Sequence, residues 1–149
     1  MIGRMASDLD TAAETRLRRE GQRYTRGRRA LVATLSTAAT PLAIGELTAE
    51  VPQSSAYRNL AVLEQAGVVR RVITDGDSAR FELAEDLTGH HHHLICSSCG
   101  RVQDVEVPPS LERDIDRALD RLARKAAFAS VHHRLDLIGT CRDCAAAGR

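Results

Sequence analysis

Apolar positions in the first half of the chain recur every three or four residues, which is the period of an α-helix. In the stretch after Thr25, alanine and leucine side chains keep this spacing until a Thr-Pro pair interrupts it, because proline cannot continue a helix. A later stretch ends at Gly67, a residue suited to the left-handed conformation that follows many helices. The pattern predicts helices over residues 11–20, 26–38, 44–50 and from Ser54 or Ser55 to Ala66, with Thr25 and one of these serines as N-caps.

After Gly67 the pattern changes to that of β-strands. Residues 68–73 and 79–83 are rich in β-branched and aromatic side chains, and the Asp-Gly pair within residues 74–78 is typical of a hairpin turn. Helices followed by a two-stranded hairpin give the element order of a winged helix-turn-helix domain. In such a domain the helix ending at Ala66 is the recognition helix, which enters the major groove of DNA.

The second half of the chain combines short β-like stretches with one long helix. Polar residues 85–89 end in a glycine and are predicted to be a hinge linker. Strands are predicted over residues 91–96, 101–107 and 129–140, with a helix over 111–126. An apolar stripe on this helix, expected to pack against the sheet, consists of Leu111, Ile115, Leu119 and Leu122. The predicted fold class is α+β, with a winged-helix DNA-binding domain over 1–84 and a small α/β domain over 90–149.

The net charge is only +1, but the positive charge is unevenly distributed. Seven arginines lie between Arg16 and Arg29, where the only acid is Glu20. Such a cluster can neutralise DNA phosphates or form a solvated helix surface. Two tyrosines, two phenylalanines and no tryptophan provide few stacking platforms for RNA or single strands. The sequence has no long apolar run and no signal-peptide core, so we expect a cytoplasmic protein without a membrane partner.

The predicted recognition helix divides into an inward and an outward face. Leu60 and Leu63 share one side at helical spacing, whereas Tyr57 and Arg58 lie off that side and can reach base edges or phosphates. Tyr57 can alternatively pack on the wing. Arginines before and within the second helix are expected to contact phosphates and to position the protein. The predicted DNA contacts are Ser55, Tyr57, Arg58, Arg23 and Arg29.

All four cysteines occur in two Cys-x-x-Cys pairs. Each pair places two thiolates on one side of a tight turn, so two pairs supply the four vertices of a tetrahedral zinc site. Disulfides are disfavoured in the cytosol, a redox pair needs only one such turn, and a four-cysteine iron–sulfur cluster is the remaining alternative. The predicted structural zinc ligands are Cys96, Cys99, Cys141 and Cys144.

All six histidines lie in two groups, at 90–93 and 132–133. Side chains alternate along a strand, so His90 and His92 point one way and His91 and His93 the other. This alternation favours two metal sites on two faces of one strand, rather than a solvated loop or an affinity-tag remnant. Carboxylates that can complete the sites are Glu82, Asp104 and Glu112. Imidazole with carboxylate suits zinc, iron(II), manganese or nickel, so the ligand types do not select the metal.

Taken together, these motifs resemble the Fur family of metal-dependent repressors. The matching segments are Arg-Tyr-Thr-x-x-Arg-Arg at 23–29, Ser-Ala-Tyr-Arg-Asn-Leu at 55–60, Arg-Phe-Glu-Leu at 80–83, His-His-His-His-Leu-Ile-Cys-x-x-Cys-Gly at 90–100 and His-Arg-Leu-x-Leu-x-Gly-x-Cys-x-x-Cys at 133–144. They cover about residues 20–145 in the family's order. The histidine run joined to Cys-x-x-Cys is the most specific of them.

The resemblance implies a homodimer whose second domain mediates dimerisation and which represses metal-homeostasis genes at palindromic double-stranded operators, with metal as corepressor. It assigns structural Zn²⁺ to the four cysteines. The second, regulatory metal would be Fe²⁺ or Zn²⁺, with Mn²⁺ and Ni²⁺ as further candidates. The regulatory hinge site would consist of Glu82, His91, His93 and Asp104, and an additional site of His90, His92, Glu112 and His133. Residues 40–44 lack the histidine that many iron and peroxide sensors supply from this loop, and no cysteine is spare for the site of many zinc sensors.

The hinge ligands suggest how metal would control DNA binding. Glu82 precedes the linker and the other three ligands follow it, so a shared metal would set the angle between the domains and hence the spacing of two recognition helices. A metal-storage or metallochaperone protein is the first alternative function, but it leaves the winged-helix order unexplained. A zinc enzyme is the second, and the sequence contains neither His-Glu-x-x-His nor a deaminase signature. We therefore predict a protein that is not an enzyme.

Overall fold

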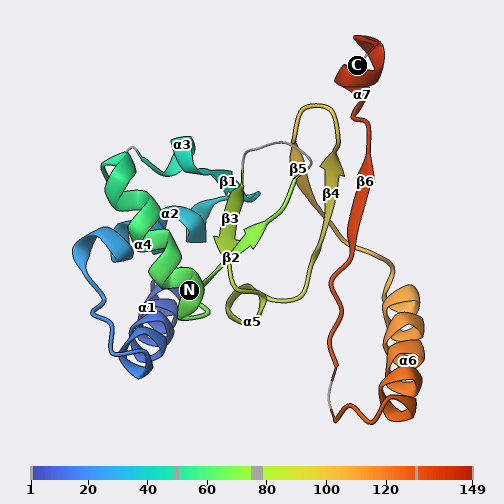
Figure 1. The fold of residues 1–149 in the computed structure, drawn as a ribbon, viewed down its shortest axis with the longest axis horizontal. Coiled ribbons are helices and arrows are strands. Elements are labelled where there is room, and N and C mark those ends of the chain that lie inside the picture. Colours follow the sequence, from blue (N-terminus) through green and yellow to red (C-terminus); the bar gives the residue numbers. More distant parts are fainter. Residues whose placement is uncertain (1, 49–50, 75–78, 130, 149) are drawn as a thin grey trace.

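The computed structural model describes residues 2–48, 51–74, 79–129 and 131–148. A helical unit with a three-stranded sheet lies beside a second unit built on another three-stranded sheet (Figure 1). The helices are α1 (Ile2–Arg19), α2 (Arg26–Thr37), α3 (Ile44–Leu47), α4 (Gln53–Gln65), α5 (Glu85–Thr88), α6 (Pro109–Lys125) and α7 (Arg142–Ala146). The strands are β1 (Leu42–Ala43), β2 (Val69–Val72), β3 (Arg80–Leu83), β4 (His92–Cys96), β5 (Val102–Val105) and β6 (Asp136–Gly139). Among the described helices, none has the length and apolar character needed to cross a bilayer.

The helices of the first unit follow the predicted order with different ends. Helix α1 begins well before the predicted residue 11. Thr25 caps α2 as expected, its hydroxyl accepting a hydrogen bond from the Arg28 N–H at 3.4 Å. The predicted serine cap of α4 is wrong, because the N-cap residue is Pro52 and no side chain caps the helix. The fixed φ of proline already directs the chain into the helix, which leaves Ser54 and Ser55 within its first turn.

The wing hairpin carries an additional strand that the sequence did not reveal. The sheet order is β1-β3-β2, and the short β1 pairs with β3 through Leu42 and Phe81. Antiparallel pairing of β2 with β3 places Arg70 directly opposite Glu82. The predicted hairpin turn falls mostly on residues 75–78, which lie outside the described residues. The hairpin thus places two oppositely charged residues side by side at the edge of the first unit.

The first unit has a continuous hydrophobic core between α1, α2, α4 and the wing. Apolar residues on the inner face of α4 are fully buried, as the helical periodicity predicts. They pack with residues of the other helices and of the hairpin. The largest side chains of this core are Leu17, Leu31, Leu35, Leu47, Leu60, Leu63, Phe81 and Leu83. The recognition helix α4 packs on this core, to which the other helices and the hairpin of the unit also contribute buried residues.

In the second sheet the order is β5-β4-β6, with β4 antiparallel to β5 and parallel to β6. His93 pairs with Asp136, and Cys96 pairs with Gly139. The strand predicted over residues 129–140 is shorter than expected, since regular pairing begins only at Asp136. The parallel pair brings the segment after β6 to the same end as the turn after β4.

Helix α6 does not pack against the sheet as the sequence predicted. Its stripe residues Leu111 and Leu122 are 45% and 60% exposed, and Ile138 on β6 is 64% exposed. In Figure 1 the helix stands beside the extended segment that leads into β6, below the sheet. The amphipathic pattern was correctly identified, but it does not reveal whether an apolar face is covered by the same chain or by another.

The expected polar linker is in fact a structured connection. Residues Glu85–Thr88 form α5, and Gly89 follows with φ of 103°, a conformation that side chains other than glycine rarely adopt. Arg16 on α1 donates hydrogen bonds to Asp86 Oδ2 and to the Gly67 carbonyl, both at 2.5 Å. These contacts tie α5 to the first unit.

A small second core joins the two units. It contains Val72 of the wing together with Ile95 and Val102 of the second sheet. Nearby, the Arg80 Nε donates to the Gly100 carbonyl at 3.0 Å. The second unit therefore buries little apolar surface of its own, and part of that surface lies against the first unit.

Candidate metal centre and nucleic-acid interface

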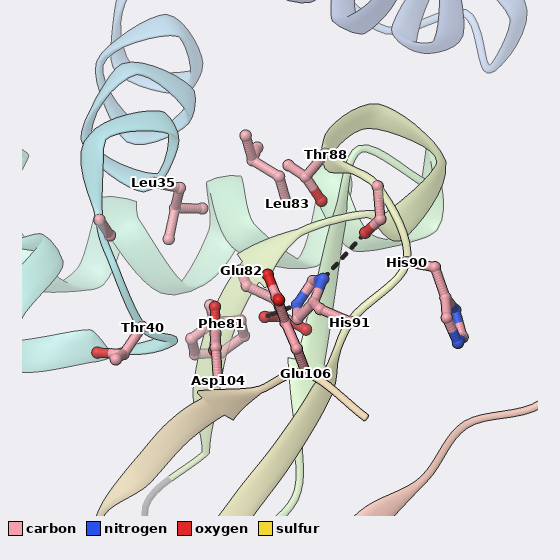
Figure 2. Close-up of a pocket in the computed structure, with 12 residues that line it drawn as sticks. Leu35, Thr40, Phe81, Glu82, Leu83, Thr88, His90, His91, Asp104 and Glu106 are labelled. Atoms are coloured by element: carbon pink, nitrogen blue, oxygen red, sulfur yellow. Dashed lines mark hydrogen bonds and ion pairs between the residues drawn. The ribbon is translucent and has the colours of Figure 1, made fainter. Parts of the chain in front are cut away.

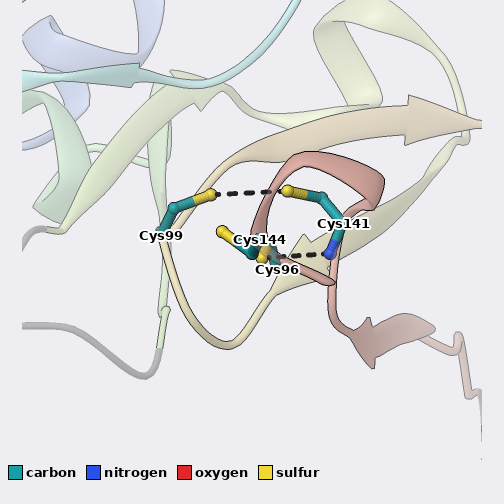
Figure 3. A group of neighbouring side chains, drawn as sticks. All are labelled: Cys96, Cys99, Cys141 and Cys144. Atoms are coloured by element: carbon teal, nitrogen blue, oxygen red, sulfur yellow. Dashed lines mark hydrogen bonds between the residues drawn. The ribbon is translucent and has the colours of Figure 1, made fainter. Parts of the chain in front are cut away.

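The four cysteines meet at one end of the second sheet (Figure 3). Cys96 ends β4 and Cys99 lies in the following turn, whereas Cys141 precedes α7 and Cys144 lies within it. Their sulfur atoms all lie within 4.8 Å of one another, and none is in a disulfide. The parallel pairing of β4 with β6 produces this arrangement, because it aligns the starting points of the two Cys-x-x-Cys turns.

The sulfur atoms of this group have different proton affinities. The Cys141 N–H donates to Cys96 Sγ at 3.2 Å. This bond and a second one from the Cys99 backbone lower the pKa of Cys96 to about 6. Contact with Cys141 and burial raise the pKa of Cys144 to about 12. A thiolate is thus already favoured at Cys96, and a cation binding all four sulfurs would complete the deprotonation.

The predicted hinge residues also lie together, and Figure 2 shows three of them, Glu82, His91 and Asp104. Glu82 comes from β3, Asp104 from β5, His91 from the segment before β4 and His93 from β4 itself. Glu82 Oε2 lies 3.2 Å from His91 Nε2 and 3.1 Å from His93 Nε2. Asp104 Oδ1 lies 3.9 Å from His93 Nε2. One carboxylate oxygen is therefore shared by two imidazoles.

Burial and charge act in opposite directions on this hinge group. Burial opposes ionisation of Glu82, but hydrogen bonds from His93 and His91 and the charge of Arg70 outweigh it and lower its pKa to about 2. Burial alone would lower the pKa of His93, but its hydrogen bonds to Glu82 and Asp136 raise that pKa above the ordinary value. The group is thus a buried anion surrounded by imidazoles that can bind a cation.

A cavity of about 310 Å³ opens beside the hinge group. Its lining includes Glu82, His91 and Asp104, together with Thr40 from the loop before α3 and Glu106 after β5. Within residues 40–44, Thr40 therefore lines the cavity beside the site, with a threonine instead of a histidine. Sequence reasoning missed Glu106, which follows Asp104 by two residues and so lies on the same side of an extended segment.

A second histidine group forms between β4 and α6. His92 Nε2 lies 3.0 Å and His90 Nε2 2.5 Å from Glu112 Oε1. His133 Nε2 lies 3.3 Å from the same oxygen. These four residues are the predicted additional set, and their possible ligand atoms all lie within 4.8 Å of one another. The alternation of histidines along β4 explains why His90 and His92 separate from the hinge pair.

Most of these imidazoles are oriented by a partner on the opposite ring nitrogen. Nδ1 of His91 faces the Gly89 carbonyl at 2.9 Å. The other Nδ1 contacts are His90 with Glu85, His93 with Asp136 at 3.1 Å and His133 with Asp116 at 3.3 Å. His92 Nδ1 is buried without a hydrogen-bond partner among the described residues. Partners on Nδ1 leave Nε2 for the site, the arrangement typical of metal-binding histidines. The sequence did not reveal Glu85, Asp116 or Asp136, which only the tertiary contacts identify.

The recognition helix presents its polar face to solvent. Tyr57 is 55% exposed and Arg58 is also exposed, while Leu60 and Leu63 are buried beneath them. Ser55 is exposed three residues before Arg58, so both lie on one face of the helix. The sequence prediction of inward and outward residues on this helix is confirmed.

Two members of the arginine cluster have structural partners within the first unit. Arg28 donates to Asn59 Oδ1 at 3.3 Å and to the Arg23 carbonyl at 2.5 Å, which ties the start of α2 to α4. The Arg29 guanidinium stacks on the Tyr24 ring at 4.1 Å and pairs with Asp10 at 3.4 Å. Arg29 therefore also holds α1 against α2, in addition to any contact with phosphate.

Comparison with known proteins agrees with this geometry. Residues 19–138 match the model of the ferric uptake regulator family. The chain belongs to the ferric uptake regulator family. The peroxide-responsive repressor PerR of Staphylococcus aureus (strain USA300) is 31% identical over 136 residues, which are 86% of this chain and 86% of that protein. The family model and this repressor thus match most of the chain.

Solved structures of the family share the fold. The ferric uptake regulator of Pseudomonas aeruginosa, determined with manganese, is 26% identical with a TM-score of 0.67, covering 86% of this chain and 96% of that one. The Helicobacter pylori ferric uptake regulator is 22% identical with a TM-score of 0.72, covering 94% and 93%. The α+β architecture, with winged helix first and the second sheet after it, is therefore the family's fold.

Proposed function

We propose that this ferric uptake regulator family member is a metal-dependent transcriptional repressor that binds palindromic DNA as a homodimer and controls metal-homeostasis genes. The observation that carries the proposal is the meeting of Glu82, from the DNA-binding unit, with His91, His93 and Asp104, from the second unit. Because these residues come from both units, a metal bound to them would influence how the DNA-binding unit is positioned. Because zinc ligation needs free thiolates, which the cytosol preserves, we place the protein in the cytoplasm.

We assign the domain boundaries to residues 1–84 and 90–149, with α5 and Gly89 as the hinge between them. The hinge residues suit a divalent cation for three reasons. Their donor atoms lie within 4.8 Å of one another, Nδ1 partners direct the imidazole Nε2 atoms inward, and the Glu82 carboxylate stays ionised at any physiological pH. A bound divalent ion would supply the positive charge that draws ligands of both units together.

The hinge residues then fix the relative orientation of the two units. With Glu82 held against His91 and His93, β3 and β4 keep one relative orientation. In a dimer this orientation sets the distance between the two α4 helices, which must match half-sites about 34–36 Å apart. Because the metal binds the DNA-competent shape better, it shifts the population toward that shape.

The cysteine group has a different role in this proposal. Cys96, Cys99, Cys141 and Cys144 would hold structural Zn²⁺, which stabilises a unit with little apolar core of its own. The exposed apolar residues Leu111, Leu122 and Ile138 would be covered by the second protomer, whose α6 and β6 present the same surface. Zinc and dimerisation thus replace the missing core.

DNA would be contacted through α4 and the arginines near α2. Arg58, Tyr57 and Ser55 face solvent on the recognition helix and would reach base edges or phosphates in the major groove. Arg23 and Arg29 would contact phosphates and position the protein without reading sequence.

The family relatives include a repressor named for its response to peroxide and a regulator solved with manganese. Two imidazoles and two carboxylates suit Fe²⁺, Zn²⁺ or Mn²⁺.

The test combines metal dependence with DNA binding. The double variant Glu82→Ala with His93→Ala should lose metal-dependent binding to a palindromic operator in a gel-shift assay, while the zinc held by cysteines persists in elemental analysis. The matched control, Asp120→Ala with His132→Ala, removes an exposed acid of α6 and an imidazole outside both histidine groups and should behave like the wild type. Metal-dependent binding that survives in the double variant contradicts the proposal. Metal binding by the wild type with no DNA binding at all would instead favour a storage protein.

A further inference from the structure

Arg70 occupies an unusual position for a cation. It lies opposite Glu82 in the wing hairpin, and only 17% of its side chain is exposed. Its Nε contacts Glu82 Oε1, and its Nη2 lies 3.5 Å from His91 Nε2. A guanidinium thus contacts two of the four residues proposed to hold the regulatory metal. Sequence analysis gave no role to this residue.

We propose that Arg70 is a resident cation that competes with the regulatory metal for Glu82 and thereby sets the metal concentration at which the hinge site fills. The inference rests on the proposed function, because it requires a divalent ion at this site. It assigns to Arg70 a role in tuning affinity, not in binding the metal itself.

The arrangement of atoms around Glu82 supports this competition. Oε1 faces Arg70, while Oε2 faces His91 and His93. The guanidinium neutralises a nearly buried carboxylate in the metal-free protein, which would otherwise be costly to bury. A divalent ion on Oε2 must share that carboxylate with Arg70, and two cations on one buried anion repel each other strongly. The same guanidinium therefore stabilises the metal-free site and weakens the metal-bound one.

Glu85 gives Arg70 a second anion close by. Arg70 Nη1 lies 3.4 Å from Glu85 Oε2, and Glu85 Oε1 contacts Nδ1 of His90. Because α5 carries Glu85 beside the hinge, Arg70 can shift its charge toward Glu85 when Glu82 is occupied. Glu85 should therefore reduce the competition between Arg70 and the metal for Glu82, and removal of Glu85 should increase that competition.

The experiment measures divalent-ion affinity by competition with a chelator, using Mn²⁺ as the probe. The protein retains its cysteine-bound zinc and carries His133→Ala, which disables the second histidine group. Arg70→Gln should bind Mn²⁺ about tenfold more tightly than the parent. Arg70→Lys keeps the charge and should stay within about threefold of the parent. The matched control is Arg71→Gln, since the neighbouring Arg71 pairs with Glu64 at 3.2 Å and lies over Phe81; it should change little.

A second variant tests the opposite effect, a weakening of Mn²⁺ binding, and remains informative if Arg70→Gln does not fold. Glu85→Gln should weaken Mn²⁺ binding about threefold or more, whereas Asp86→Asn, which removes the adjacent acid paired with Arg16, should not. Thermal unfolding in chelator gives an independent measure. Arg70→Gln should lower the midpoint temperature of unfolding more than Arg71→Gln does. Added Mn²⁺ should recover a larger part of that loss in Arg70→Gln than in Arg71→Gln.

The outcomes separate the two proposals. Unchanged or weaker Mn²⁺ binding in Arg70→Gln, or an unchanged affinity in Glu85→Gln, overturns the role of Arg70 while the hinge site stands. A parent protein that binds no Mn²⁺, Zn²⁺ or Fe²⁺ at the hinge, with His93→Ala giving the same titration, overturns the proposed function itself.

Discussion

Glu82 and His93 belong to different sheets, yet Glu82 Oε2 lies 3.1 Å from His93 Nε2, with only 10% and 1% of their side chains exposed. The wing hairpin supplies the carboxylate and the second sheet supplies the imidazole. Their contact joins the two units, so protonation or metal binding at this pair would act on the relation between the first unit and the second.

The first prediction concerns the stability of the protein with its histidine sites free of metal. The folded-state pKa of Glu82 is about 2, below its ordinary 4.5, so its contribution is present above pH 4.5 and lost as pH falls toward 2. The pKa of His93 is raised above 6.5, so its contribution is present below pH 6.5 and lost as pH rises through the folded-state value. Thermal unfolding in a weak chelator should show a falling midpoint above pH 6.5. His93→Gln should flatten this decline, and an equal slope in both proteins would contradict the prediction.

Metal binding at the hinge should release a proton. Because His93 holds its proton above the ordinary pKa of 6.5 and a metal requires the neutral imidazole, apparent affinity should rise with pH and repression should weaken on acidification. Calorimetric titrations with Mn²⁺ in two buffers of different ionisation enthalpy measure the protons released. The carboxylates around His93 place that loss of repression at a higher pH than an ordinary imidazole would give. A proton release of zero at pH 6.5 would rule this out.

Arg58 should be essential for DNA binding but not for folding. The residue is exposed on α4, so Arg58→Ala should weaken operator binding about tenfold to hundredfold without changing the unfolding midpoint. Gel-shift titrations and circular dichroism check both parts. Arg113→Ala, an exposed arginine on α6, is the control and should bind DNA like the wild type. If Arg58→Ala binds with unchanged affinity, α4 does not contact DNA through this residue.

Loss of one cysteine should unfold the second unit. Cys144 is buried within α7, and Cys144→Ser should remove the zinc and lower the unfolding midpoint by about 10 °C or more, because zinc binding contributes folding free energy. Elemental analysis and calorimetry give the two readouts. Ser97→Ala, in the turn between Cys96 and Cys99, controls for local disturbance. Retention of one zinc per chain in Cys144→Ser would argue against a four-cysteine site.

The exposed stripe of α6 should mediate dimerisation. Leu122 is 60% exposed, and an aspartate there would place a charge in the proposed interface, where an unpaired buried charge is strongly unfavourable. Leu122→Asp should shift the protein from dimer to monomer in light scattering. The dimer dissociation constant should rise about a hundredfold. The adjacent exposed Arg121→Asp is the control for charge. A Leu122→Asp protein that remains a dimer at micromolar concentration would place the interface elsewhere.

Regular periodicity made several elements predictable. The 3.6-residue period identified α2, α4 and α6, and the buried faces of Leu60 and Leu63 follow directly from it. The two-residue period of β4 separated His90 and His92 from His91 and His93, as the two histidine groups confirm. Helix N-caps were less predictable. Thr25 caps α2 as expected, but the N-cap of α4 is Pro52 and not a serine. Backbone geometry competed there with side-chain hydrogen bonding.

What the sequence by itself determined is which residues are candidate ligands and in what order the elements follow, since both depend on residue type and short-range spacing. Only the tertiary structure decided which distant groups meet. The parallel pairing of β4 with β6 brought Asp136 to His93, and the wing hairpin placed Arg70 against Glu82. It also left the α6 stripe uncovered within one chain. Such contacts depend on the pairing of strands that lie far apart in the sequence, and burial then influences which side chains are charged. No local sequence pattern specifies either of these.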